Sequence, residues 1–257
     1  MSVSLHLLSV TLGWAYVVCW GISLYPPVFL HRKLRSVEGM SIDFAVINFV
    51  GCLAYFVSVF MLYYSMTVRL EYQLRHKKIP LVRFNDVVYG AHSLVLVCIV
   101  MWQFYLSGYK RGTSQKISRW VKLMAGLIFL GAVGLLLHAW EISTTRRHYE
   151  LVDVANIFGT AKIVMSSIKY FPQAYFNYSR KSTRGFSITG PWLDILGSVC
   201  SVSQLVLDAY LTGDVSDIYK HPVKLLLSLV TFVCSLIFVI QHHIYTERKI
   251  PFYNKEA

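Results

Sequence analysis

Seven apolar stretches of about 20 residues constrain the fold of this chain more than any other feature. That length lets an α-helix cross roughly 30 Å of hydrocarbon. Hydrophobic residues make up 55% of the 257 residues and charged residues only 15%, which is typical of a membrane protein. We therefore predict an all-α membrane protein with seven transmembrane helices in a lipid bilayer. The expected spans are residues 4–26, 42–66, 87–109, 120–140, 155–178, 188–212 and 224–246.

The formal net charge of +12 is distributed in short basic clusters between the apolar stretches. Because these clusters form no continuous stripe, we expect no nucleic-acid partner. Basic connections tend to stay cytosolic. Counting Lys and Arg in and beside alternate connections, with Lys122 and Lys224 included, gives 14 on one side against 9 on the other. This predicts a cytosolic C-terminus and a lumenal N-terminus, although the basic connection between the second and third spans argues the other way.

A shift of 146 residues superposes two parts of the sequence. Pro26 then matches Pro172, Gly39 matches Gly185, and Asn48 matches Asp194. Each copy runs from an apolar helix through a proline to a basic loop and a second helix. We predict two parallel three-helix-bundle repeats joined by a linker helix, with a central site between them. The expected parts are residues 1–109, the linker with its loops at 110–150, residues 151–246 and a cytosolic tail at 247–257.

Charged side chains inside the predicted fifth and sixth spans are the main exception to the apolar pattern. Each costs about 2.5–3.5 kcal/mol on insertion scales, so a polar pathway between helices is the default interpretation. In the fifth span the polar residues recur every three or four positions, which places them on one helical face suited to the carboxylates and amines of an amino acid. The alternative is that both lysines snorkel to the membrane interfaces. These residues are Lys162, Ser166, Lys169, Gln173 and Asn177.

Two proline-containing segments carry extended motifs, YPPVF with RSVEGMSIDFAVINFVG in the first repeat and KYFPQ followed by NYSRKSTRGFSI and LDILG in the second. They resemble the first and the second PQ-loop of the cystinosin family. The resemblance extends over nearly the whole chain, including IQHH near the end of the seventh span. It implies a proton-coupled exporter of L-cystine in a lysosomal or vacuolar membrane, with no cofactor.

The sequence departs from the family pattern at three positions. Pro27 stands where the first motif has glutamine, Gly190 where the family commonly has asparagine, and Ser235 where it often has an acid. These changes weaken the assignment of the substrate most. An exporter of a cationic amino acid is the closest alternative, but Lys162 and Lys169 would repel such a substrate. A seven-helix receptor is an alternative of another class, which leaves the repeated proline loops unexplained.

Asp194 is the expected proton-coupling residue. Burial in the membrane favours its neutral form and a nearby lysine its ionised form, so a change in exposure would change its protonation. The alternative is a static salt bridge. Asp43 is either a second titrating group or an acid stabilised by the N-terminus of its helix. Asn48 is expected to contact substrate or to make an interhelical hydrogen bond.

The motif prolines have a mechanical interpretation. Proline removes one backbone hydrogen bond and collides with the preceding turn, so Pro26, Pro27 and Pro172 should bend or unwind their helices. Alternatively, each proline ends its helix at the membrane boundary. Gln173 is expected to bond backbone groups freed by the kink and to change partners as a gate moves. The sequence contains no nucleophile-base pattern, phosphate loop or metal motif, so we expect neither an enzyme nor a metal site; a homo-oligomer is left open.

Overall fold

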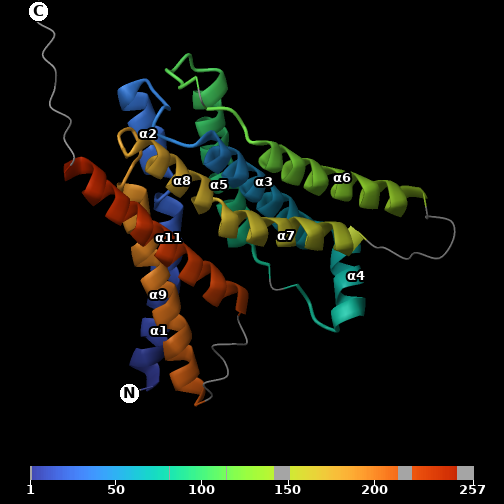
Figure 1. The fold of residues 1–257 in the computed structure, drawn as a ribbon. Coiled ribbons are helices and arrows are strands. Elements are labelled where there is room, and N and C mark those ends of the chain that lie inside the picture. Colours follow the sequence, from blue (N-terminus) through green and yellow to red (C-terminus); the bar gives the residue numbers. More distant parts are fainter. Residues whose placement is uncertain (1, 81, 114, 142–150, 214–221, 248–257) are drawn as a thin grey trace, which may run out of the picture. The chain divides into compact units, whose positions relative to one another are not determined.

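The computed structural model describes residues 2–80, 82–113, 115–141, 151–213 and 222–247, and its regular elements there are α-helices (Figure 1). In chain order the helices are α1 (Ser2–Ile22), α2 (Tyr25–Leu34), α3 (Ile42–Tyr64), α4 (Met66–His76), α5 (Phe84–Tyr105), α6 (Arg119–Glu141), α7 (Leu151–Ile168), α8 (Tyr170–Arg180), α9 (Thr189–Thr212) and α11 (Pro222–Glu247).

Seven segments of the described chain are long and apolar enough to cross a membrane, which confirms the predicted all-α fold with seven spans. Two of them, Ser4–Leu34 and Leu151–Arg180, each comprise two consecutive helices. The other five are α3, α5, α9 and most of α6 and α11. Predicted and observed spans differ chiefly at the ends of these two long segments.

The two long spans are interrupted at matched positions of the repeat. α1 ends at Ile22 and α2 begins at Tyr25, whereas α7 ends at Ile168 and α8 begins at Tyr170. In both cases the motif proline falls in the first turn of the new helix, where its missing N–H is tolerated. The helices resume for 10 and 11 residues, so the prolines mark breaks within the spans rather than their ends.

The loops after α2 and α8 share the same backbone conformation and the same backbone hydrogen bond at their first residues. Arg35 and Lys181 both adopt left-handed backbone conformations, with φ of 50° and 48°. The amide of Ser36 donates to His31 O and that of Ser182 to Asn177 O, each at 3.3 Å. Since the sequence offset is the same 146 residues, the repeat is a structural one as well.

Close packing divides the chain into two compact units. Unit 1 comprises residues 1–40 and 171–257, and unit 2 comprises residues 41–170. Each unit therefore combines segments from both halves of the sequence. The predicted parts, with boundaries at 109, 150 and 246, follow the sequence repeat rather than the packing of the helices. The division into these parts stays a prediction. Residues 142–150 of the predicted linker and 248–257 of the predicted tail lie outside the described residues.

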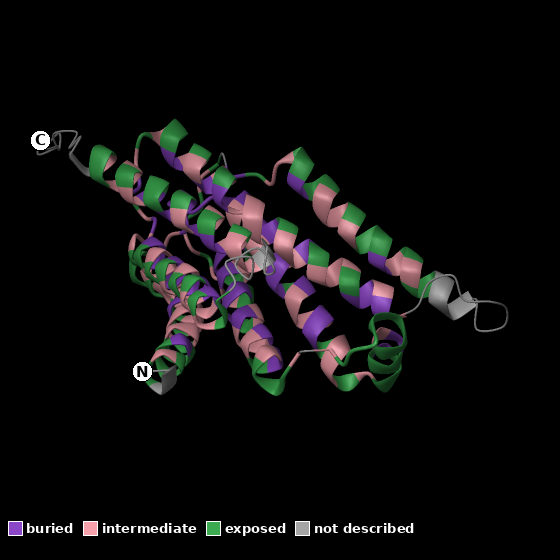
Figure 2. Cartoon of the chain, turned by 90° about the horizontal axis from the view of Figure 1, so that it is seen from below, coloured by how far each residue is buried: buried purple, intermediate pink, exposed green. Residues whose placement is uncertain are grey.

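Within unit 1, α9 packs against both α1 and α11. Small residues allow the close approach: a Cβ at Gly197 would lie 2.7 Å from the Trp20 ring. Within unit 2, α3 packs against α5 and α7, while α6 lies on α7. Buried residues line the faces where helices meet and exposed ones their outer faces (Figure 2). In a membrane protein the exposed apolar faces are those available to lipid.

Candidate functional site

Lys169 lies at the break between α7 and α8, in unit 2. Its Nζ donates a hydrogen bond to Oδ1 of Asn48 on α3 at 3.3 Å. The ammonium is also 4.8 Å from the ring centroid of Tyr170 and 6.0 Å from that of Phe44. Two aromatic rings and an amide oxygen are favourable surroundings for a cation. Asn48, for which substrate contact or an interhelical hydrogen bond was expected, here bonds to Lys169 of the fifth span.

Lys162 lies two turns earlier on α7. Its ammonium is 5.6 Å from the ring centroid of Tyr55, and its stem lies beside Gly51, where an added Cβ would be 3.9 Å from Cδ. Ser166 is half-buried between the two lysines on the same helix. This half of the predicted polar face thus lies together in unit 2, next to α3.

Gln173 and Asn177, on α8 in unit 1, belong to a buried chain of amides. Both side chains are 0% exposed. Gln173 Nε2 donates to Gly39 O at 3.2 Å and to Asn177 Oδ1 at 2.8 Å. Asn177 Nδ2 donates to Gln241 Oε1 at 3.1 Å, and Gln241 Nε2 donates to Ala174 O at 2.9 Å. The chain joins the first loop, α8 and α11.

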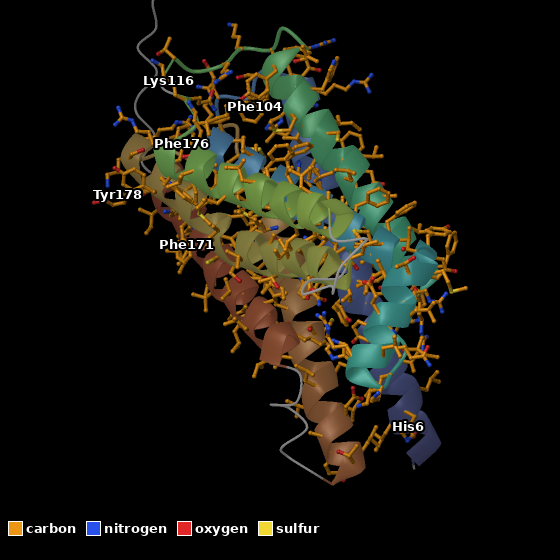
Figure 3. All side chains as sticks on the ribbon, turned by 90° about the vertical axis from the view of Figure 1, so that its right-hand side faces the viewer. His6, Phe104, Lys116, Phe171, Phe176 and Tyr178 are labelled. Carbon is orange, nitrogen blue, oxygen red and sulfur yellow. The ribbon has the colours of Figure 1, made fainter. Side chains whose placement is uncertain are left out.

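The single polar face predicted along residues 162–177 is divided by the break at Lys169. Its α7 part lies in unit 2 and its α8 part in unit 1. Gln173 does bond to a backbone carbonyl, but that carbonyl belongs to Gly39 in the first loop, not to the kinked helix. Phe171 and Tyr178 lie on the exposed surface of the same helix (Figure 3). α8 therefore has a polar buried face and an aromatic exposed one.

The two loops meet at Gly39 and Gly185. A Cβ added to Gly39 would lie 2.0 Å from the carbonyl carbon of Gly185, so only glycine fits there. Gly185 has a φ of +80°, which also favours glycine. The sequence alone does not indicate this contact. In the first repeat Pro27 occupies the position of Gln173, so the loop contact has an amide donor from α8 alone.

Asp194 is half-buried in the second turn of α9. The hydroxyl of Ser198 donates to its backbone oxygen at 2.8 Å. Asp194 is the repeat counterpart of Asn48, and Lys169 is the counterpart of Ser23. In the sequence repeat, a serine and an acid thus stand where the other copy has a lysine and an amide.

Asp43, in the first turn of α3, is buried and accepts hydrogen bonds from both the amide and the hydroxyl of Ser118. Ser118 directly precedes α6, so this carboxylate fixes the start of the fourth span. Sequence reasoning missed the partner. Ser118 could have been noticed as a serine immediately before an apolar helix, which is the usual capping position.

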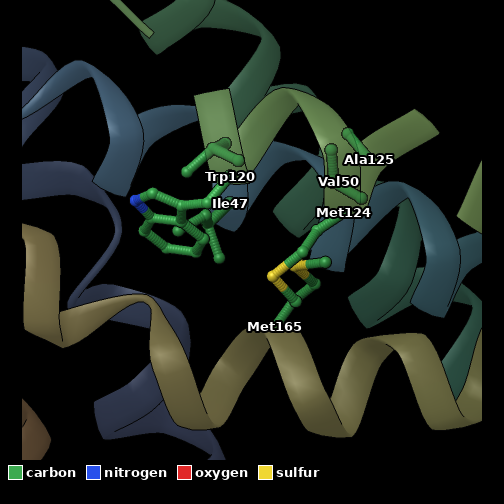
Figure 4. Close-up of a pocket in the computed structure, with 7 residues that line it drawn as sticks. Ile47, Val50, Trp120, Met124, Ala125 and Met165 are labelled. Carbon is green, nitrogen blue, oxygen red and sulfur yellow. The ribbon is translucent and has the colours of Figure 1, made fainter. Parts of the chain in front are cut away.

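An apolar crevice in unit 2 is a poor alternative site. It is lined by Ile47, Val50, Trp120, Val121, Met124, Ala125 and Met165 from α3, α6 and α7 (Figure 4). These side chains offer no charge to an amino acid. Among the described residues, no three His, Cys, Asp or Glu side chains are grouped to hold a metal ion.

Seven spans, two loops of one design and an intramembrane lysine at a helix break define a PQ-loop membrane protein. The PQ loop repeat family matches residues 8–68 and 154–213. The chain is 34% identical to a cystinosin homolog of Caenorhabditis elegans, covering 93% of this chain and 58% of the relative. It is 33% identical to one of Dictyostelium discoideum over 94% and 82%, and 30% identical to the cystine transporter of Saccharomyces cerevisiae over 92% and 94%.

These similarities show that the chain belongs to the cystinosin family. It spans less than two thirds of the length of the nematode relatives.

Proposed function

We propose that this protein exports L-cystine from the acidic lumen of a lysosome or vacuole to the cytosol, coupled to protons, by alternating access. The observation that carries the proposal is Lys169, an ammonium at a helix break inside a membrane span and next to Asn48. An ionisable side chain inside a membrane span is costly to bury and commonly marks a functional site. The similarity to the yeast cystine transporter supports cystine as the substrate.

Cystine carries two carboxylates and two ammonium groups, which complement the polar residues of unit 2. Lys169 and Lys162 would bind carboxylates through charge-assisted hydrogen bonds. Asn48 and Ser166 would accept from the substrate's ammonium groups. Asn177 is a substrate ligand in this proposal only when the buried amide chain opens, because both ends of its amide are bonded within unit 1.

Asp194 is the proposed proton-coupling residue. When the site faces the acidic lumen, a protonated Asp194 allows the loaded protein to reorient without moving a bare carboxylate through an apolar region. Deprotonation on the near-neutral cytosolic side then favours release and reset. Asp43 is the second candidate, but its two bonds to Ser118 favour a structural role.

The interrupted helices would supply the moving parts. Pro26, Pro27 and Pro172 lie in the first turns of α2 and α8, where short helices can pivot against the longer ones before them. Gln173 would hold the first loop in one conformation and release it in the other. We place the N-terminus in the lumen and the C-terminus in the cytosol.

Proteoliposomes loaded with cystine, arginine or glucose, with and without an imposed pH gradient, test the proposal. We expect cystine flux that a gradient accelerates and that moves protons with it. Arginine-selective flux would instead support export of a cationic amino acid, and no flux of any of these substrates would contradict transport of cystine.

Asp194→Asn tests the coupling separately. This variant should retain cystine exchange but lose net proton-driven transport, since an amide resembles the protonated acid and cannot release a proton. Glu38→Gln, which changes an exposed loop acid, serves as the matched control. Proton movement by Asp194→Asn at the parental ratio would exclude this residue and leave Asp43 as the next candidate.

A further inference from the structure

α4, in the connection between the second and third spans, is a short helix with three different faces. The first face packs against α7. Val68 packs in a buried cluster with Val152 and Ala155 of α7. Glu71, which is 6% exposed, accepts a hydrogen bond from the amide of Val152 at 2.9 Å. This carboxylate therefore caps the first turn of α7.

A second connection strengthens the attachment of α4 to α7. Arg75 donates to both carboxylate oxygens of Asp153, a bidentate geometry that fixes orientation. Arg75 and Glu71 are one turn apart, so two successive turns of α4 hold the start of α7. α4 is thus attached to α7, the helix that ends at Ile168, one residue before Lys169.

The second face is apolar and uncovered by the described protein. Met66, Leu70 and Leu74 recur every four residues, which aligns them along one side of the helix. They are 69%, 53% and 71% exposed. At 100° per residue this stripe lies on the side of the helix opposite Arg75 and Val68, which face α7.

The third face is polar and basic. Arg69 and His76 lie on the side between the other two faces, and Lys77 and Lys78 follow directly after the helix. All four are exposed. A helix with an apolar stripe flanked by basic residues has the composition of those that lie in a membrane interface.

The placement of α4 identifies what covers the apolar stripe. Only Ser65 separates it from α3, a membrane span, so α4 starts where that span ends. Figure 1 shows α4 running across the direction of α3 and α7 at the end of unit 2. Because the spans run through the bilayer, a helix that crosses their ends lies along its surface.

We propose that α4 is a membrane-surface helix, with Met66, Leu70 and Leu74 inserted among the acyl chains and Arg69, Lys77 and Lys78 facing anionic headgroups. The partner of this surface is the lipid leaflet at the start of α7. This also accounts for the basic connection that opposes the charge bias of the other loops. Arg75 neutralises Asp153, and the remaining cations serve lipid contact rather than orientation.

Spin labels test the proposal in the full-length protein reconstituted in phosphatidylcholine vesicles with or without phosphatidylserine. Leu70→Cys and Leu74→Cys place a label on the apolar stripe, and Arg69→Cys places the matched control on the polar face. The native protein, labelled in parallel, corrects for the natural cysteines. We expect the stripe labels to collide with oxygen, which concentrates in lipid, and the control label to collide with a water-soluble nickel complex.

Equal access of the nickel complex to labels on both faces would overturn the proposal, because the stripe would then lie in water. Strong dipolar coupling between two copies labelled at Leu74→Cys would overturn it in favour of a protein partner. The two stripe positions give independent readings, so either variant decides the question if the other does not fold. Because the basic residues bind anionic headgroups in this proposal, phosphatidylserine should move the labels on the apolar stripe deeper into the bilayer.

Discussion

Among single side chains, Lys169 is the one on which transport is expected to depend most. Lys169→Ala removes the ammonium and its bond to Asn48, and a charge-assisted hydrogen bond contributes about 1.5–3 kcal/mol. We therefore expect kcat/KM for cystine to fall by about tenfold or more. Flux into proteoliposomes measures this, with Lys122→Ala as the control, since Lys122 is an exposed lysine of α6 in the same unit. Equal losses in the two variants would contradict a specific role.

Asn177 gives a different expectation, because its amide is buried and bonded at both ends. Asn177→Ala leaves Gln241 Oε1 without its donor and removes one acceptor of Gln173. An unsatisfied buried polar group costs about 1–3 kcal/mol, so thermal stability should fall. Intrinsic tryptophan fluorescence during heating measures the change, and Ser179→Ala, on the exposed side of α8, is the control.

A double-mutant cycle distinguishes the amide chain from separate contacts. The combined Asn177→Ala and Gln241→Ala variant should be more stable than the sum of the two single losses predicts, because each single change already breaks the same hydrogen bond. Strict additivity would show that the two amides do not act as one chain.

The sequence could identify these residues but not always their partners. Charge in an apolar span indicated Lys169, Lys162 and Asp194, and the repeat offset linked Asn48 to this set. The helical period placed Gln173 and Asn177 on the same face as the lysines, because a continuous helix was assumed. The break at Lys169 separates them, and no local pattern joined Gln241 to Asn177 or Ser118 to Asp43. Side-chain partners from distant segments depend on packing, which periodicity does not contain.

Among the structural elements, the two loops are held by the contact of Gly39 with Gly185. Gly39→Ala would place a methyl group against the backbone of the second loop, so one loop must shift. Overpacking of this kind costs about 1–3 kcal/mol, and we expect a corresponding drop in thermal stability. Gly126→Ala is the control, since nothing lies within 4 Å of an added Cβ there. A Gly39→Ala protein as stable as the control would show that the loops separate without cost.

The helices themselves were largely predictable. All seven predicted stretches coincide with helical segments that are long and apolar enough to cross a membrane. The prolines indicated the breaks in α1–α2 and α7–α8, although the predicted first span stopped at residue 26 and left out most of α2. α4 was missed as an element because its 11 residues are too few and too polar for a span. Only its attachment to α7 shows that it is ordered.

For the molecule as a whole, the distribution of basic residues predicts which ends face the cytosol. A protease added outside intact vacuoles should digest a tag placed after Ala257. A membrane-impermeant maleimide should label Arg184→Cys from the same side, since an even number of spans was assigned between the second loop and the C-terminus. Labelling of the two positions from opposite sides would contradict that assignment. A tag sealed inside the organelle would reverse the topology.

The composition of the two compact units could not be read from the sequence. Two repeats of the same design offer each first helix two similar sets of partners, and hydropathy does not distinguish them. The structure groups α1 with α9 and α11, and α7 with α3 and α5. The choice depends on fitted pairs such as Gly197 with Trp20 and Gly51 with Met165.

This grouping has a consequence for biosynthesis. The ribosome makes α1 first, but its packing partner α9 follows only after all of unit 2, residues 41–170, has been synthesised. At about 5–20 residues per second, the first span waits on the order of ten seconds in the membrane before its partner exists. During that time Ser9, which later donates to Asp208, faces lipid or the insertion machinery. Nascent chains released before α9 should therefore keep α1 accessible to membrane chaperones, whereas complete chains should conceal it.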